Sequence, residues 1–347
     1  MVDRGPARPR LVDVARRAGV STATASLVLR GRPGPSEATA RSVREAAAAL
    51  GYRPDRTASL LARHRSRLIG VLLDVTSPFH AELVRALDDE AAERDLDLVL
   101  STVTARRDEA RAAETLLDFR CEALVLLGPA MSDPALDALP DSVPTVVVGR
   151  RGTARVPGVL VSDDQGLELV VDHLAALGHR RIAFVDGPRG SIAAARRAGY
   201  RAAMRRHGGA TEVDVLAGGA TEEAGVRAAR HLLARRRGEP PTAVVCFNDR
   251  CAIGLRDTVL RAGLDLPGEL SVVGYDDSPL ARLGTVDLTS VSQEPGRLAH
   301  ATVQLLAAVV RGDGVGGADV VIDPRLVVRS SSGPPAAARS SSPDRMS

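Results

Sequence analysis

The stretch LVDVARRAGVSTATASLVLRG, residues 11–31, predicts two short helices joined by a turn. The first helix has one apolar face, formed by Leu11, Val14, Ala15 and Ala18 at helical spacing. Gly19 supplies the positive φ that a tight turn between two helices needs. Ser21 stands where the second helix needs an N-cap, because its hydroxyl can accept from the amides of the following turn.

The second predicted helix, about residues 22–30, leaves part of its surface open to a partner. We expect it to bury Ala25, Val28 and Leu29 and to present Thr22, Ala23, Ser26, Leu27 and Arg30. The positions of Ala15, Gly19, Ala25 and Val28 have the spacing of a DNA-binding helix-turn-helix. Two short amphipathic helices around a glycine also occur in other helical domains, so this motif alone leaves both interpretations open.

Positive charge is concentrated around the motif. Residues 1–67 carry 14 arginines against five acidic residues, whereas the rest of the chain carries 32 arginines against 38 acidic residues. Binding to phosphate requires a local basic excess of this kind, so the distribution favours DNA as the partner. All 46 Lys and Arg positions are arginine, which indicates composition bias and by itself says nothing about nucleic acid.

Two segments follow the motif. Ser36 caps a third predicted helix, which Gly51 ends, and three short helices make a compact module over residues 1–52. Residues 53–67 are an arginine-rich linker in which two adjacent leucines have little to bury them. The linker is either a solvated hinge whose leucines pack on the next domain, or a helix that folds only on DNA and inserts a leucine into the minor groove.

From residue 68, apolar strands alternate with amphipathic helices, and a second run of the same kind begins near Asp164. Continuous Val/Ile/Leu strands are typical of parallel sheets that are covered on both faces. We therefore predict an α/β domain of two doubly wound lobes over residues 68–329. A small molecule is expected between the lobes, beyond the carboxyl ends of the strands. Residues 330–347 have the Ser/Pro/Ala composition of a disordered tail.

Several predicted strands end in residues that would face this cleft. They are Asp74, Ser77, Phe79, Asp163, Asp164, Asn248, Asp249, Asp276 and Asp277. A single aspartate here is equally expected as a helix N-cap, but several around one cleft favour a binding site. Arg196 and Arg197, near the start of their helix, would either meet an anionic or polyhydroxy ligand or be solvated surface charges.

Composition argues against several other classes of protein. No run approaches the roughly 18 apolar residues of a membrane helix, and the N-terminus has no hydrophobic signal core, so we expect a cytoplasmic protein. Three cysteines without paired spacing fit buried thiols in a reducing compartment, and no metal-ligand cluster is recognisable. The absence of lysine excludes a Schiff base and a phosphate-loop lysine. The sequence also has no GxGxxG after a strand and no GxSxG, so we expect no cofactor.

Over about residues 10–330 the sequence resembles transcription regulators of the lac/galactose repressor (LacI/GalR) family. The opening stretch carries the first match, and LGYRPDRTASLLA carries the second. In the larger domain the matches are HLAALGHRRIAFVDGP, RRAGY, PTAVVCFND with CAIGL, LPGELSVVGYDD and LTSVSQ. The resemblance implies a small all-α helix-turn-helix headpiece joined to a two-lobed domain like that of periplasmic binding proteins.

The resemblance also implies roles for individual residues. Contacts with DNA are expected from Ser21, Thr22, Ala23, Thr24, Ser26, Leu27, Arg30, Ala58 and Leu61. Leu61, with Ala58 one turn earlier, matches the family's minor-groove wedge, which favours the second interpretation of the linker. The expected effector-binding residues are Phe79, Arg196, Asn248, Asp276 and Gln293. Among them, Arg196 and Asp276 match an arginine and its carboxylate partner.

The sequence departs from the family pattern at positions that bear on specificity. Ala25 stands where valine is usual, and Leu27 stands where arginine is common. Because Ala23 and Leu27 offer no bidentate donor, we expect apolar contacts, such as those to thymine methyl groups, and a correspondingly different operator. The strand end VSDDQG is offset from the usual VDDxxGG, so its two aspartates are not expected to bind the effector.

The leading hypothesis is a homodimeric repressor that binds a pseudo-palindromic operator. A sugar or related metabolite between the lobes would shift their orientation and so change DNA affinity. A sugar-binding transport receptor shares the two-lobed architecture, but it needs export and does not explain the basic headpiece. A two-domain α/β enzyme is the third hypothesis, and the lack of lysine and of a nucleophile motif argues against it. The tail has no leucine heptads, so no tail-built tetramer is expected.

Overall fold

The computed structural model describes residues 9–29, 33–52, 66–208, 213–235, 240–313, 317 and 319–336. The chain divides into two compact units, residues 1–66 and 67–347. Arg30, Ala58 and Leu61 lie outside the described residues, as do residues 53–65 of the predicted linker. Across the described ranges, no helix combines the length and the apolar character needed to cross a membrane.

The N-terminal unit contains the predicted three helices: α1 (Leu11–Ala18), α2 (Thr22–Leu29) and α3 (Glu37–Leu50). Gly19 ends α1 with a φ of 69°, and Ser21 Oγ accepts from Thr24 N at 3.0 Å. Ser36 Oγ caps α3, and Gly51 ends it in the left-handed conformation. The core consists of Val14, Ala15, Ala25, Val28, Val43, Ala46 and Ala47. Alanines at the crossings allow the short helices to pack closely.

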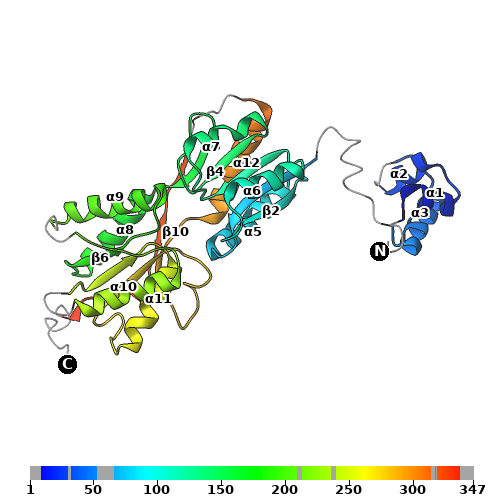
Figure 1. Ribbon diagram of the computed structural model, residues 1–347. Coiled ribbons are helices and arrows are strands. Elements are labelled where there is room, and N and C mark those ends of the chain that lie inside the picture. Colours follow the sequence, from blue (N-terminus) through cyan, green and yellow to red (C-terminus); the bar gives the residue numbers. More distant parts are fainter. Residues whose placement is uncertain are drawn as a thin grey trace, which may run out of the picture. The chain divides into compact units, whose positions relative to one another are not determined.

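The first lobe of the larger unit is a six-stranded sheet in the order β11-β5-β4-β3-β1-β2 (Figure 1). Its strands, all parallel, are β1 (Leu68–Asp74), β2 (Asp97–Val103), β3 (Ala123–Leu127), β4 (Thr145–Val148), β5 (Gly158–Val161) and β11 (Val320–Ile322). Helices α5 (Pro78–Ala92) and α12 (Pro295–Arg311) cover one face of the sheet. The other face carries α6 (Glu109–Asp118), α7 (Asp133–Asp137) and the short 3-10 helix η1 (Leu139–Asp141).

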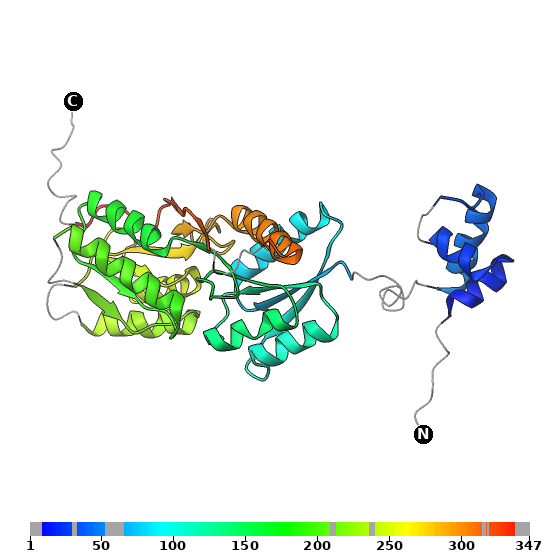
Figure 2. The same ribbon diagram turned by 90° about the horizontal axis from the view of Figure 1, so that it is seen from above.

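The second lobe repeats this plan in the order β12-β10-β9-β8-β6-β7. Its strands are β6 (Ile182–Val185), β7 (Asp214–Leu216), β8 (Ala243–Cys246), β9 (Ser271–Asp276), β10 (Thr289–Ser292) and β12 (Arg325–Val327). Helices α8 (Asp163–Ala176) and α9 (Ser191–Arg206) cover one face, and α10 (Glu222–Ala234) and α11 (Asp249–Arg261) cover the other. Figure 2 shows each sheet between its two layers of helices.

The prediction of two doubly wound α/β lobes is confirmed, with two additions. The chain crosses between the lobes three times, after β5, after β10 and after β11. The final strands therefore belong to different lobes: β11 pairs with β5 in parallel, while β12 pairs with β10 antiparallel. Each sheet reverses its strand order between β1 and β3, or between β6 and β8, which is where doubly wound sheets bind ligands.

The disordered tail was predicted to begin at residue 330, but the ordered chain continues beyond that residue. Ser331 Oγ donates to Val272 O at 2.6 Å, and Gly333 N donates to Ser271 Oγ at 3.0 Å, so this segment is held against β9. His179 Nε2 contacts Gly333 O at 2.9 Å. Small serine and glycine residues let the chain lie close to the sheet, and the described fold extends to residue 336. Residues 337–347 lie outside the described part of the chain.

Candidate functional site

A cavity of about 580 Å³ lies between the two lobes of the larger unit. The residues that follow the carboxyl ends of strands in both sheets line it, among them Asp74, Thr104, Gly128, Gly149, Asn248, Asp276 and Gln293. This is the place that the sequence analysis predicts for a ligand, because the strands of both sheets end there. Among the described residues, no cluster of histidine, cysteine, aspartate and glutamate could hold a metal ion.

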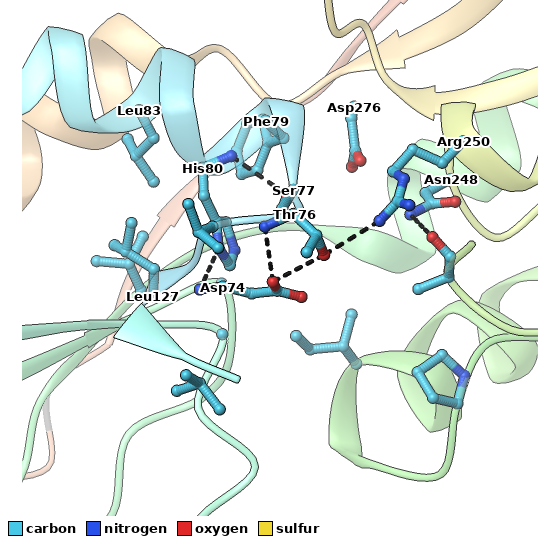
Figure 3. Close-up of a pocket in the computed structure, with 18 of the residues that line it drawn as sticks. Asp74, Thr76, Ser77, Phe79, His80, Leu83, Leu127, Asn248, Arg250 and Asp276 are labelled. Atoms are coloured by element: carbon cyan, nitrogen blue, oxygen red, sulfur yellow. Dashed lines mark hydrogen bonds between the residues drawn. The ribbon is translucent and has the colours of Figure 1, made fainter. Parts of the chain in front are cut away.

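The structure brings together all five predicted effector-binding residues in this cavity. Its lining includes Phe79, Arg196, Asn248, Asp276 and Gln293, and Asp74 and Ser77 also belong to it. Figure 3 shows the cavity with Phe79, Asn248 and Asp276 around it. The Asn248 side chain also caps α11, since its oxygen accepts from Cys251 N at 3.0 Å. Its amide nitrogen donates to Ala220 O at 3.1 Å.

Arg196 is a buried cation, with only 4% of its surface exposed. Its Nε donates to Asp163 Oδ1 at 2.9 Å, and its Nη1 donates to Phe247 O at 2.5 Å. The guanidinium carbon lies 3.6 Å from the centroid of the Tyr275 ring, so the ring packs against the charged plane. These contacts fix the orientation of Arg196, while the N–H groups of Nη2 have no hydrogen-bonded partner among the described residues.

Asp276 faces Arg196 across a gap. Its Oδ1 lies 3.9 Å from Arg196 Nη2, too far for a hydrogen bond, and it accepts from Gln293 Nε2 at 2.6 Å. The φ of Asp276 is 112°, a strained conformation for a non-glycine residue and one that is common at functional sites. Burial raises the pKa of the Asp276 carboxyl to about 6, although the Arg196 guanidinium favours its ionised form. The pair offers a donor and an acceptor to one hydroxyl group.

Other strand-end candidates have structural partners instead. Asp249 is buried and accepts from Ser290 Oγ at 2.6 Å, while Asp277 pairs with Arg329 Nη2 at 2.7 Å. Arg197 forms an ion pair with Asp186 and does not line the cavity. Asp163 and Asp164 line a second cavity, of about 420 Å³, between β5 and α9. Sequence reasoning therefore missed the role of Asp163, which holds Arg196 and accepts from Tyr275 OH at 2.9 Å.

A polar chain that no sequence pattern predicts joins the lobes (Figure 3). Arg250, on α11, donates from Nη1 to Thr76 Oγ1 at 3.2 Å, and Thr76 Oγ1 donates to Asp74 Oδ1 at 2.8 Å. Glu222 on α10 holds the same arginine through two further hydrogen bonds. The backbone N of Asp74 donates to Nδ1 of His80 at 3.2 Å. No local pattern marks Thr76 and Arg250 as partners, since they lie 174 positions apart.

A second contact between the lobes predicts a measurable effect on stability. Arg282, in the loop after β9, donates to both carboxylate oxygens of Glu82 on α5, at 2.8 and 3.3 Å. The Glu82 side chain is only 10% exposed, so it needs this cation. We expect Arg282→Gln to lower the free energy of unfolding by about 2 kcal/mol, because it leaves a nearly buried carboxylate unpaired.

Urea unfolding of a double-mutant cycle tests this contact. Glu82→Gln should cost less than Arg282→Gln, and the double variant should cost less than the sum of the two. Arg261→Gln is the matched control, because the ion pair of Arg261 with Asp257 is exposed on both sides. Additive effects in the cycle would contradict a coupled contact between the lobes.

The predicted DNA-binding residues that the structure describes lie on α2 or directly before it. Ser21, Thr22, Ala23 and Leu27 are exposed, Thr24 and Ser26 are partly buried, and Ala25 and Val28 are buried, as predicted. Ser21 Oγ and Thr24 Oγ1 lie 2.9 Å apart and share one hydrogen bond, which leaves hydroxyl capacity for a phosphate. Leu27 is 43% exposed, and no described side chain covers it fully. An exposed leucine on α2 is available for apolar contacts.

A helix-turn-helix unit and a two-lobed unit with a cavity between its lobes define a class of protein that binds DNA and a small ligand with one chain. Residues 10–55 match the family model for bacterial regulatory proteins of the lacI family. Residues 171–332 match the model for a periplasmic binding protein-like domain. The chain is 34% identical over 302 residues to the ribose operon repressor of Escherichia coli strain K12, covering 85% of this chain and 91% of that protein.

Solved structures agree with these matches. A LacI transcriptional regulator from a Rhodococcus species is similar at 44% identity and a TM-score of 0.74, over 77% of this chain and 98% of that one. A lac repressor dimer bound to operator and the anti-inducer ONPF has a TM-score of 0.78 at 29% identity, over 94% of this chain and 99% of that one. The chain belongs to the LacI family of bacterial transcription regulators.

Proposed function

We propose that this regulator is a homodimeric, cytoplasmic repressor that binds a pseudo-palindromic operator and responds to a sugar or related metabolite. The observation that carries the proposal is the pair of Arg196 and Asp276, whose facing atoms stand 3.9 Å apart in the cavity between the lobes. A hydroxyl group between them can accept from the guanidinium and donate to the carboxylate. Since the cavity is lined by both lobes, a ligand there favours one arrangement of the lobes over another.

The roles of the cavity residues follow from their positions. We assign effector contacts to Phe79, Arg196, Asn248, Asp276 and Gln293. Phe79 supplies an apolar face, and Gln293 orients the Asp276 carboxylate.

The DNA contacts belong to α2 and the segment after α3. We assign phosphate contacts to Ser21 and Thr24 and major-groove contacts to Thr22, Ala23, Ser26 and Leu27. Leu61, with Ala58, is proposed as the wedge that opens the minor groove, and Arg30 as a further contact. The solved lac repressor is a dimer on its operator, and we propose the same arrangement here because a palindrome matches a two-fold protein.

Fluorescence anisotropy of the full-length protein on DNA from upstream of its own gene tests the function. The expected result is salt-sensitive binding to one fragment, which D-ribose, D-galactose, D-glucose or cellobiose changes by about 5- to 150-fold. Chromatography of the sugars after incubation should recover them unchanged, whereas turnover would favour an enzyme. Equal affinity for all fragments at every salt concentration would contradict a sequence-specific regulator.

Leu27 provides a separate prediction about how the operator is recognised. We expect Leu27→Ser to weaken binding to the operator by about fivefold, close to 1 kcal/mol, because the serine loses apolar contact with thymine methyl groups. Binding to unrelated DNA should change little, since that affinity depends on phosphate contacts. Val310→Ser on α12, at 37% exposure, is the control for removing an exposed apolar side chain. Equal losses on operator and unrelated DNA would argue against base contact by Leu27.

A further inference from the structure

We propose that His80 determines which neutral polyhydroxy effector the cavity accepts, by donating a hydrogen bond from Nε2 to an acceptor oxygen of the ligand. The inference rests on the proposed function and adds a requirement on the ligand. His80 lies in the first turn of α5, where its backbone N donates to Ser77 Oγ at 3.3 Å, and its ring lines the cavity.

The backbone sets the tautomer of His80. Asp74 N donates to Nδ1 at 3.2 Å, and a backbone amide can only donate, so Nδ1 must carry the lone pair. The proton of the neutral ring is therefore on Nε2. Burial lowers the pKa of the His80 imidazole below its ordinary value, although the Asp74 carboxylate acts in the opposite direction. A neutral ring also agrees with the contact between Asp74 N and Nδ1. His80 is thus an uncharged donor at neutral pH.

The Nε2 atom borders open space. No described residue accepts a hydrogen bond from it, and the one fully buried side-chain atom without a partner in the described ranges is Ser278 Oγ. A Cβ placed on Gly128 would lie 3.7 Å from His80 Nε2 and 3.7 Å from Ile192 Cδ1. Gly128 therefore leaves room between a residue of the first lobe and a residue of the second, next to this donor.

The other polar groups of the cavity leave His80 with a distinct role. Arg250 is held by Glu222 and Thr76, and the Asn248 side chain has partners on both of its polar atoms. In the second lobe, Arg196 Nη2 and Asp276 keep hydrogen-bonding capacity. In the first lobe, His80 Nε2 is a ring N–H donor without a described partner, beside the carboxylates of Asp74 and Glu109 and the hydroxyl of Thr104. A ligand that satisfies both sides carries a hydroxyl group for the charged pair and an acceptor oxygen for His80. An ammonium or a methyl group next to Nε2 would leave this donor without an acceptor.

Calorimetric titration of the full-length protein with D-ribose, D-galactose, D-glucose and cellobiose tests this requirement. For the sugar that binds, we expect His80→Phe to weaken binding at least tenfold, because the ring remains and the donor is lost. His80→Gln should remain within about threefold of the unmodified protein, since the glutamine amide can present N–H near the Nε2 position. His300→Gln is the control for replacing a histidine, since His300 is exposed on α12 and pairs with Glu90.

Deoxy analogues of the bound sugar locate the acceptor. The analogue that lacks the acceptor oxygen should bind the unmodified protein at least fivefold more weakly than the parent sugar does. On the His80→Phe variant, the same analogue and the parent sugar should bind with equal affinity. If His80→Phe binds every sugar as tightly as the unmodified protein, the proposal is overturned while the sugar response stands. If the unmodified protein binds none of the four sugars, the proposal is overturned together with the proposed sugar response.

Discussion

Replacing Arg196 by methionine should weaken effector binding at least a hundredfold and remove the response of DNA binding to that effector. Methionine keeps much of the aliphatic length of arginine but none of its donors. The substitution removes the Nη2 group that faces Asp276 and leaves Asp163 and Asp276, both largely buried, without their cation. Hydrogen bonds to charged groups contribute roughly 1.5–3 kcal/mol each, so the loss of two such contacts with a ligand accounts for the expected effect.

Arg197→Met is the matched control, because it changes the neighbouring residue of the same helix. Arg197 pairs with Asp186 and lies outside the cavity lining, so its replacement should leave effector affinity within about threefold. Titration calorimetry gives the affinities, and urea unfolding of both variants shows whether each retains a folded larger unit. A folded Arg196→Met variant that binds the effector normally would remove Arg196 and its pairing with Asp276 from the binding site.

The headpiece could be predicted from the sequence in detail, because its signals are local. Gly19, Ser21, Ser36 and Gly51 each act on the turn or helix that contains them, and the structure shows each one in the predicted place. The apolar residues repeat at helical spacing and form the predicted core. Residues within one or two turns of each other determine all of these features, so no tertiary information is needed.

The location of the cavity could also be predicted, because parallel strands in a doubly wound sheet end at one edge. The resemblance to the LacI/GalR family supplied the five effector candidates. The strand order explains why segments that are far apart in the sequence, such as those at Phe79 and Gln293, meet in the cavity. Side-chain pairing was beyond this reasoning. Arg282 and Glu82 are 200 positions apart, and the support of Arg196 by Asp163 depends on how α8 packs against α9.

The prediction that a disordered tail begins at residue 330 was wrong for a physical reason. Low hydrophobicity and several serines are typical of disorder when a segment has no partner. Here Ser331 and Gly333 complete backbone and side-chain hydrogen bonds of β9, and Ser331 is buried. The first residues of β9, which precede its pairing with β10 from Val273 onward, supply the partner, and composition alone does not reveal it.

The largest expected effect on stability comes from the crossing of α10 and α11. Gly225 on α10 and Gly254 on α11 let the two backbones meet without side chains between them. A Cβ on Gly254 would lie 2.0 Å from Glu222 O, and one on Gly225 would lie 2.0 Å from Cys251 O. Neither oxygen belongs to a flexible side chain, so a methyl group at either position must push the helices apart.

We expect Gly254→Ala to lower the free energy of unfolding by about 3 kcal/mol, as measured by urea denaturation. Alanine favours a helix over glycine by roughly 1 kcal/mol, so a net loss can come only from the packing of the two backbones. Gly296→Ala, in the first turn of α12, is the control, because nothing lies within 4 Å of its added Cβ. That variant should be neutral or slightly stabilised. Since Asn248 and Arg250 stand at the start of α11, displacement of this helix should also weaken effector binding. A Gly254→Ala variant that is as stable as Gly296→Ala would contradict the close approach of the two helices.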